Sequence, residues 1–199
     1  MKKLIACLGY NLNPDGSIPP ILQNRLNDSI KLAQDAPGSE LLLMGAQSYQ
    51  DNTTLSSQAS AMFDYVTCAT SDIDVTRIRK EERSTSALQQ VFALRDYMSR
   101  YELTVVASEY YIDRIRFFAA YLLGQEAIIH FVGSAIPQDQ REAFREAEGL
   151  KLETARRWLA KHQEAGDHEA IIAEEQAFQD FAKAQLAQQP GSWVDYHKP

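Results

Sequence analysis

The stretch Leu8-Gly9-Tyr10-Asn11-Leu12-Asn13-Pro14-Asp15-Gly16-Ser17 decides the fold, because it joins an apolar run to a helical pattern. The run before it, residues 4–8, is continuous and apolar, as in a buried strand. The pattern after it, residues 21–36, places Leu22 and Leu26 on one helical face. A turn of this kind puts backbone N–H groups at the carboxyl edge of a parallel sheet, where such sheets bind ligands. The sequence therefore predicts a ligand site after its first strand.

The same alternation of strand and helix continues along the chain as far as Gly133. Further strands are expected at residues 40–44, 75–80, 103–107 and 127–132, with helices between them at 57–68, 86–100 and 110–123. Parallel neighbours need crossover connections, which are right-handed and place helices on the sheet faces. The pattern therefore predicts a Rossmann-like α/β domain at residues 1–133, with a mainly parallel, five-stranded sheet covered by helices on both faces.

The composition changes after Gly133. Residues 138–189 are dominated by Ala, Glu, Gln, Lys and Arg, with one break at Gly166-Asp167, which favours two helices forming a hairpin. Apolar side chains form a stripe on these helices: Trp158, Leu159, Ile171, Ile172, Phe178 and Phe181. We expect residues 134–199 to be a helical extension with a tail from Gly191, packing on the sheet domain or on a second copy of the chain as a homodimer.

The charge pattern limits the partners of this protein. The net charge is −7 and there is no dense run of Lys and Arg, which argues against nucleic acid and anionic membranes. Lys2-Lys3 precedes an apolar run that ends at Gly9, too short for a signal peptide, so a cytoplasmic location is expected. Cys7 and Cys68 form no CxxC pair and suit buried reduced thiols better than a disulfide framework. We expect a small-molecule or protein partner.

Several motifs carry less weight. Gly9-Tyr10-Asn11 lacks the later glycines of a dinucleotide fingerprint, so a hydride-transfer cofactor is not expected. The His-containing residues 162–169 fall at the predicted turn between two helices and predict a solvated cap, not a metal site. His130 lies in an apolar strand and is expected in the core. Ser84 and Ser108 have no nearby His to activate them, which argues against a hydrolytic triad.

Charged side chains gather at the predicted strand ends. The carboxylates are Asp15, Glu81, Glu82, Glu109 and Asp113, and the guanidinium groups are Arg25, Arg83 and Arg114. In one interpretation, Arg114 binds a carboxylate or phosphate group of a ligand. Glu81 or Glu109 then binds a ribose hydroxyl or an ammonium group. In the alternative interpretation, Arg25 forms an ordinary ion pair with Asp15, and Arg114 forms one with Asp113. For any one of these residues taken alone, the ion-pair interpretation is favoured. Because all of them are expected at one edge of the sheet, the set as a whole favours a ligand-binding site.

Three aromatic side chains accompany these charges: Tyr10, Tyr110 and Tyr111. Their rings are suited to stacking on an adenine. They are nearly as well suited to covering the core.

The order of motifs resembles the YdcF-like family, which includes the SanA and ElyC envelope proteins. The motifs are Gly9-Tyr10-Asn11 with Asp15-Gly16, then Arg25-Leu26, Gly45, Glu81-Glu82-Arg83-Ser84, and Ser108-Glu109-Tyr110-Tyr111-Ile112-Asp113-Arg114. The match covers residues 3–133, by order and spacing more than by identity. It implies a Rossmann-like fold with a pocket above the strand ends. Some members are linked to S-adenosylmethionine or a similar ligand, and others to envelope polysaccharide or peptidoglycan.

This resemblance implies a set of site residues. Those expected to bind ligand are Gly9, Tyr10, Asn11, Asp15, Arg25, Gly45, Gln58, Ser84, Gln89, Ser108 and Arg114. Those expected to carry chemistry are Tyr111, Glu81 and Glu109. The chain departs from the family where Gln58 and Gln89 replace two carboxylates and Tyr111 replaces a His. Amides do not exchange protons near neutral pH, and a Tyr titrates near ~10, so acid–base chemistry at these positions is weakened.

Two functions therefore compete. The first is a cytoplasmic small-molecule enzyme, a transferase or lyase, that binds S-adenosylmethionine or a related adenosine ligand. It acts by positioning and electrostatics, without a metal. The second is a non-catalytic binding or interaction protein related to envelope homeostasis. The first is favoured, because a sulfonium is a good leaving group that needs no strong base.

Overall fold

The computed structural model describes residues 1–47, 56–124, 127–162 and 168–188. The chain divides into two compact units, Met1–Ile136 and Pro137–Pro199. The boundary that the change of composition predicts, after Gly133, lies close to this division.

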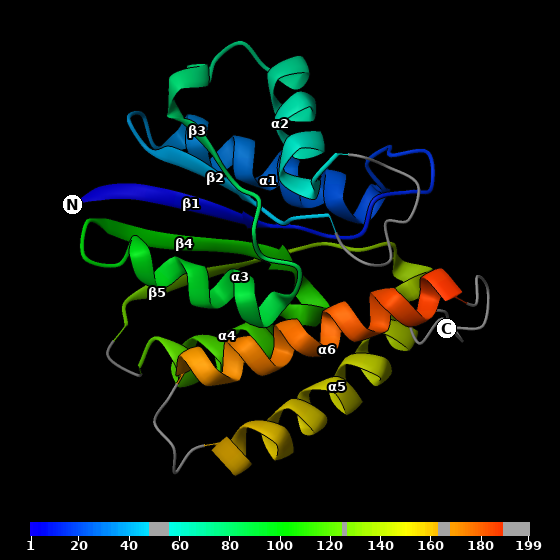
Figure 1. The fold of residues 1–199 in the computed structure, drawn as a ribbon. Coiled ribbons are helices and arrows are strands. Elements are labelled where there is room, and N and C mark those ends of the chain that lie inside the picture. The colour runs from blue at the N-terminus through cyan, green and yellow to red at the C-terminus, as the bar shows by residue number, and fades with distance from the viewer. Residues whose placement is uncertain (48–55, 125–126, 163–167, 189–199) are drawn as a thin grey trace. The chain divides into compact units, whose positions relative to one another are not determined.

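The described residues of the first unit form a five-stranded sheet (Figure 1). Its strands are β1 (Lys2–Leu8), β2 (Glu40–Met44), β3 (Ile78–Glu81), β4 (Tyr101–Ser108) and β5 (Ile129–Ser134). Their order across the sheet is β3-β2-β1-β4-β5, and every neighbouring pair is parallel. The predicted Rossmann-like α/β fold with a five-stranded parallel sheet is confirmed.

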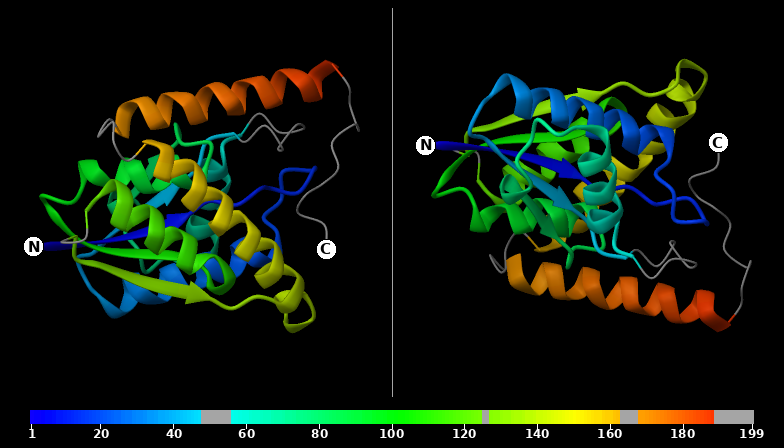
Figure 2. Two further views of the ribbon diagram at one scale, coloured as in Figure 1. Left: turned by 90° about the horizontal axis from the view of Figure 1, so that it is seen from below. Right: turned by 90° about the horizontal axis from the view of Figure 1, so that it is seen from above.

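Helices cover both faces of this sheet (Figures 1 and 2). The helices of the first unit are α1 (Pro20–Asp35), α2 (Gln58–Ala69), α3 (Ala87–Ala93) and α4 (Ile112–Leu122). Helices α1 and α2 lie on one face, and α3 and α4 lie on the other. Because crossovers between parallel strands are right-handed, the chain changes face when it passes from the β1-β2-β3 half to the β4-β5 half.

The core on the α1 face reflects the periodicity of a strand and that of a helix. Ile5 and Cys7 are two residues apart along β1 and point to the same face, and both lie in one buried cluster with Leu22 and Leu26 of α1. A spacing of two residues selects one face of a strand, and a spacing of four selects one side of a helix. A fully buried leucine contributes about 1.5–3 kcal/mol relative to an exposed one. The apolar pattern therefore fixes which face of α1 meets the sheet.

The bounds of several predicted elements differ in the structure, and at three of them the difference is a 3-10 turn. The strand expected from Val75 begins at Ile78, because Asp74 Oδ1 accepts a 2.9 Å hydrogen bond from Thr76 N and closes a 3-10 turn at Val75–Arg77. The helix expected at residues 86–100 stops as α3 at Ala93 and tightens into a 3-10 turn, Leu94–Asp96. The helix expected from Tyr110 starts with the 3-10 turn Glu109–Tyr111 and becomes α-helical at Ile112.

His130 corrects another expectation. Its side chain is 61% exposed and its Nε2 lies 3.5 Å from Glu102 Oε1, so it is not a core residue. The reason is the position of β5, which pairs with β4 alone and forms an edge of the sheet. The apolar sequence around His130 indicates a strand, but the strand order decides how exposed that strand is.

The second unit contains α5 (Arg141–His162) and α6 (His168–Gln188). Trp158 Nε1 of α5 donates a 3.3 Å hydrogen bond to Glu174 Oε1 of α6, and Leu159 and Ile171 are buried. The predicted break at Gly166-Asp167 and the tail from Gly191 lie outside the described residues, as do the side chains of Phe178 and Phe181 in the predicted stripe.

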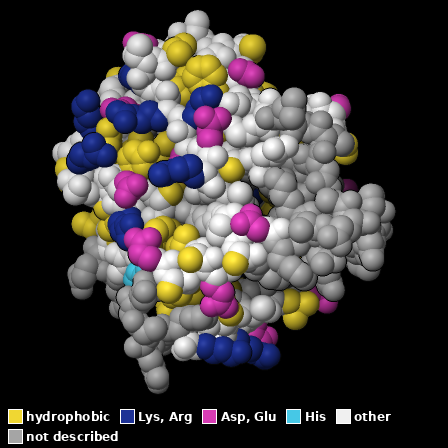
Figure 3. Space-filling view, in the orientation of Figure 1, with side chains coloured by type: hydrophobic (Ala, Val, Ile, Leu, Met, Phe, Trp, Pro, Cys, Tyr) yellow, Lys and Arg dark blue, Asp and Glu magenta, His cyan; other side chains and the backbone are white. Residues whose placement is uncertain are grey.

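The surface carries charges of both signs. On the face drawn in Figure 3, Lys and Arg side chains gather toward one side with Asp and Glu side chains among them. Within the described ranges, no helix combines the length and the apolar character that crossing a membrane requires.

Candidate functional site

The candidate site lies where the strand order of the sheet reverses. The chain passes from β1 to β2 on one side, while β4 and β5 lie on the other side of β1. In open α/β sheets, ligands bind outside the carboxyl ends of the strands at such a switch point. Here the loop that starts at Gly9 follows β1, and the turn Glu109–Tyr111 follows β4. The two loops flank the candidate site.

Arg25 of α1 is fully buried beneath these loops. Its Nε donates a 2.8 Å hydrogen bond to Ser108 Oγ at the end of β4. Its Nη1 donates to the carbonyl oxygens of Leu8 and Gly9, at 3.0 and 2.8 Å. One guanidinium therefore joins the carboxyl ends of β1 and β4.

Two aromatic rings lie close to the same guanidinium. The Arg25 Cζ is 5.3 Å from the Tyr10 ring centre and 5.6 Å from that of Tyr111, within the range of cation–π attraction. Among the described residues, Arg25 forms no ion pair with a carboxylate, and its Nη2 is buried without a hydrogen-bond partner. Burying a charge without a counterion is costly. Hydrogen bonds and aromatic rings surround this guanidinium at the switch point, but no carboxylate among the described residues pairs with it.

The two ion pairs considered for these arginines do not form. Asp15 is exposed and its Oδ1 accepts hydrogen bonds from Ser17 N and Oγ, at 2.9 and 2.6 Å, which hold its pKa below the usual value. Asp113 Oδ1 lies 3.5 Å from Arg116 Nη1. The guanidinium of Arg114 instead lies over the Tyr111 ring at 4.6 Å. The alternative is therefore wrong for the two pairs that it names, Arg25 with Asp15 and Arg114 with Asp113.

Gly9 and Gly45 leave room for a buried amide. A Cβ at Gly9 would lie 2.3 Å from Gln58 Oε1 and 2.4 Å from the Met44 carbonyl oxygen. A Cβ at Gly45 would lie 2.4 Å from the same Gln58 oxygen, and Gly45 has a φ of +136°. Both glycines are thus required by the close approach of Gln58, which is itself buried. The structure brings these three predicted site residues together.

Gln90 is a residue that the sequence did not single out. Its Oε1 accepts a 3.0 Å hydrogen bond from Gly9 N and so holds the first residue after β1. The predicted Gln89 instead turns to its own loop, where its Oε1 accepts from Thr85 N and Oγ1 at 2.7 and 3.0 Å. Both amides are buried at the start of α3. The pair of glutamines was visible in the sequence, but nothing there shows which one faces β1.

The predicted acids after β3 stabilise their own loop. The buried Glu81 Oε1 accepts from Arg83 N at 2.9 Å and from Ser84 N at 3.2 Å. The Ser84 carbonyl oxygen accepts from Ala46 N at 2.8 Å, which ties this loop to the end of β2. Glu82 is held by the Ser57 and Ser60 hydroxyls, whose hydrogen bonds lower its pKa. These contacts account for the charges without a ligand.

The other predicted residues lie in the two loops that flank the switch point. Asn11 is half-buried in the loop after β1. Glu109 starts the 3-10 turn after β4, and its Cα would be 3.0 Å from a Cβ at Gly133. The rings of Tyr110 and Tyr111 in the same turn are 6.1 Å apart.

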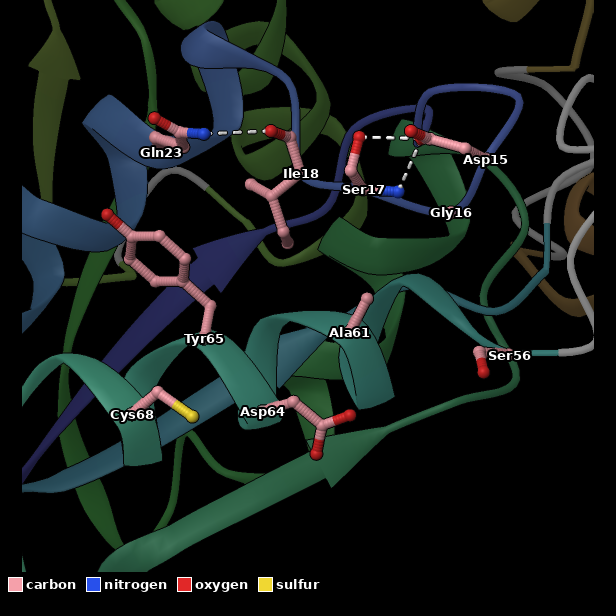
Figure 4. A pocket seen from close by; sticks show the side chains of 10 residues that line it. All are labelled: Asp15, Gly16, Ser17, Ile18, Gln23, Ser56, Ala61, Asp64, Tyr65 and Cys68. Atoms are coloured by element: carbon pink, nitrogen blue, oxygen red, sulfur yellow. Dashed lines mark hydrogen bonds between the residues drawn. The ribbon is translucent and has the colours of Figure 1, made fainter.

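An open hollow lies beside the candidate site, between the loop after β1 and helix α2 (Figure 4). Its volume of about 640 Å³ falls within the range of small-molecule sites. Asp15, Gly16 and Ser17 form one wall, and Asp64, Tyr65 and Cys68 of α2 form the opposite wall. Of the predicted site residues it includes only Asp15. The sequence did not predict this hollow.

In the part of the chain that the structure describes, no three His, Cys, Asp or Glu side chains are grouped so that they could hold a metal ion. No protein-family model and no curated protein matches this chain. The resemblance to the YdcF-like family therefore stays a prediction from the order of motifs.

Proposed function

We propose that this protein binds a small adenosine-containing ligand of the S-adenosylmethionine type at the carboxyl edge of the sheet. The proposed place is the switch point between the loops after β1 and β4. The observation that carries this proposal is the buried Arg25 guanidinium there, which has no carboxylate counterion among the described residues. A ligand that brings its own negative charge satisfies this arrangement.

The aromatic residues support the nucleoside part of the proposal. Tyr10 and Tyr111 come from the two loops that flank the switch point, and both rings lie near Arg25. Such rings supply large, flat, apolar contact areas with a polar end, which suits a purine base. S-adenosylmethionine unites a purine, a carboxylate and a sulfonium leaving group.

The proposed reaction class is group transfer or elimination at an activated ligand. Glu81 is hydrogen-bonded within its own loop, which leaves Tyr111 and Glu109 as the candidates for chemistry after β4. Gln58 replaces an acid that the family resemblance would place there, so positioning of the ligand and electrostatic stabilisation supply the proposed catalysis.

A thermal-shift titration tests binding. S-adenosylmethionine, S-adenosylhomocysteine and adenosine are each added to the full chain, and a ligand at ~100 times its dissociation constant adds about 2.7 kcal/mol of stability. We expect at least one of them to raise the melting temperature. If none does, the proposal is wrong and the interaction-protein alternative is favoured.

Two matched variants locate the ligand. Tyr111→Leu removes a ring at the switch point, whereas Tyr65→Leu removes a ring from the hollow of Figure 4. We expect the first variant to lose the ligand-induced shift and the second to keep it. The reverse result would place the ligand in the hollow and contradict the proposed place.

A further inference from the structure

Arg25 of α1 and Ser134 at the end of β5 each carry a buried polar atom without a hydrogen-bond partner. The atoms are Arg25 Nη2 and Ser134 Oγ, and both residues are fully buried. Buried polar groups are almost always hydrogen-bonded, so two such atoms require an explanation. These two atoms, unlike Arg25 Nε and Nη1, therefore keep unused hydrogen-bonding capacity.

The register of the sheet places the two residues close together. Ser134 is the direct neighbour of Ser108 across the β4–β5 pair, and Ser108 Oγ accepts the 2.8 Å hydrogen bond from Arg25 Nε. Adjacent strands lie about 4.8 Å apart. Asn24, the neighbour of Arg25, donates to the Ala135 carbonyl oxygen at 2.9 Å and holds the end of β5 against α1.

The two serine side chains also share a face. Val106 belongs to the core cluster on the α1 face, together with Leu22 of α1, and the partly buried Val132 packs against this cluster. Side chains two residues apart along a strand point to the same face, so Ser108 and Ser134 also point toward α1. The unpartnered hydroxyl and the unpartnered guanidinium nitrogen therefore lie on one side of the sheet, at one edge.

We infer that Arg25 and Ser134 form a subsite for an anionic group, a carboxylate or a phosphate, of the ligand. The choice of an adenosine ligand rests on the proposed function, but the subsite itself rests on these two side chains. A guanidinium makes its strongest hydrogen bonds to carboxylate and phosphate oxygens, and a serine hydroxyl can donate to the same group. Because Nη2 is buried, side chains around it have to move aside when the anion enters, and the rings of Tyr10 and Tyr111 lie nearby, 5.3 and 5.6 Å from Arg25 Cζ.

A purely structural role for Arg25 explains only part of the arrangement. The hydrogen bonds to Ser108, Leu8 and Gly9 account for Nε and Nη1, as a brace between β1 and β4 would require. They do not account for Nη2, for the missing counterion, or for the unpartnered Ser134 hydroxyl. An anion accounts for all three.

Calorimetric titration with three probes tests this inference on the full chain. S-adenosylhomocysteine has an adenosine and a carboxylate, methylthioadenosine has the adenosine alone, and inorganic phosphate has the anion alone. Ser134→Ala removes the unpartnered hydroxyl at the subsite. Ser39→Ala is the control, because Ser39 Oγ is equally buried and unpartnered but lies before β2, at the amino edge.

We expect wild-type protein to prefer S-adenosylhomocysteine over methylthioadenosine by about tenfold or more, as charge-assisted hydrogen bonds provide. Ser134→Ala and Arg25→Lys should each reduce this preference at least threefold, and each should weaken the binding of phosphate to the same degree. Ser39→Ala should leave both the preference and the phosphate binding unchanged. Circular dichroism of each variant checks that the fold is intact, and Ser134→Ala keeps the test valid if Arg25→Lys does not fold.

The outcomes separate this inference from the proposed function. If phosphate binds and is weakened by Ser134→Ala while neither adenosine compound binds, the anion subsite holds and the adenosine proposal fails. If the adenosine compounds bind equally well and Ser134→Ala changes nothing, the subsite is wrong and the adenosine proposal holds. Binding of none of the three probes overturns both.

Discussion

Gly9 and Gly45 are the residues whose replacement has the clearest physical consequence. A methyl group at either position meets Gln58 Oε1 at 2.3–2.4 Å, and at Gly9 it also meets the Met44 carbonyl oxygen. Overpacking of this kind typically costs about 1–3 kcal/mol. We predict that Gly9→Ala lowers the free energy of unfolding by at least this amount, as measured by urea denaturation.

Gly149→Ala is the matched control. Gly149 lies within α5, and no atom lies within 4 Å of a Cβ built there. Alanine is favoured over glycine in a helix by about 1 kcal/mol, so this variant should not be destabilised. Equal losses from both substitutions would show that Gly9 is not constrained by its neighbours.

Gln58→Glu is predicted to destabilise the protein in a pH-dependent manner. Gln58 is buried, so desolvation should raise the pKa of a carboxyl group introduced there above its value of about 4.3 in the unfolded chain. A raised carboxyl pKa means that the variant loses stability as pH rises above that unfolded value. We expect a loss of about 2 kcal/mol or more at neutral pH, and a smaller loss near pH 4.

Gln89→Glu provides the comparison for this prediction. Gln89 is equally buried, but its Oε1 already accepts from the Thr85 amide and hydroxyl, which would stabilise a carboxylate. The loss at neutral pH should therefore be smaller than for Gln58→Glu. Chemical denaturation at several pH values measures both, and a larger loss for Gln89→Glu would contradict the assigned contacts.

At the scale of elements, Glu40 joins four strands at the amino edge of the sheet. From β2, its Oε2 accepts from Arg79 Nε of β3 at 2.5 Å and from Tyr101 OH of β4 at 3.0 Å, and its Oε1 lies 3.7 Å from Lys2 Nζ of β1. Burial raises the pKa of Glu40, but the hydrogen bonds from Tyr101 and Arg79 outweigh it and hold the pKa below the usual value.

We predict that Glu40→Gln lowers stability by about 1.5–3 kcal/mol at neutral pH, the usual contribution of a hydrogen bond to a charged group. Because the folded pKa is depressed, the carboxylate stabilises wild type above its unfolded value of about 4.3, and the effect is lost as pH falls through the lower folded pKa. The difference between wild type and variant should therefore shrink in acid.

Glu102→Gln is the control at the same edge, since its pair with His130 is exposed and should contribute about 0–1 kcal/mol. Urea denaturation between acid and neutral pH measures both variants. A Glu40→Gln deficit that stays constant with pH would contradict the assigned network.

The sequence predicted the elements well where the apolar pattern was long. The runs at Leu4 and Leu103 are continuous, and both form buried strands of the expected type. The prediction failed at element ends that depend on single hydrogen bonds, such as the turn that Asp74 closes before β3. Exposure of His130 was not predictable either, because it depends on the order of the strands.

At the scale of the whole molecule, the two cysteines should react very differently. The expectation that both thiols are buried is wrong for Cys68, which is exposed near the end of α2. Cys7 lies fully buried in the central strand β1, where burial raises the pKa of its thiol to about 11. Only the thiolate reacts with labelling reagents. We predict that Cys68 is labelled rapidly in the native protein, and that Cys7 is labelled only at the rate of unfolding. Mass spectrometry of labelled peptides measures both rates, and rapid labelling of Cys7 would contradict a rigid sheet.

The candidate site was predictable only in outline. The sequence correctly predicted that Gly9, Gly45 and Ser108 lie at one edge of the sheet. Each lies at the end of a strand, and parallel strands end at the same edge because they share a direction. The buried role of Arg25 had a signal in the sequence, since it lies three residues after Leu22 on the apolar face of α1. No signal in the sequence shows that Gln90, and not Gln89, bonds to Gly9, because this depends on the exact rotation of α3.

We propose that a ligand binds at the carboxyl edge between β1 and β4. Heteronuclear NMR of the full chain during titration with S-adenosylhomocysteine locates such a ligand residue by residue. We expect the amide signals of Gly9, Ser108 and Ser134 to shift together and saturate, while those of Ser39 at the amino edge and Asp64 beside the hollow stay in place. Shifts confined to Asp64 and its neighbours, or no shifts at all, would contradict it.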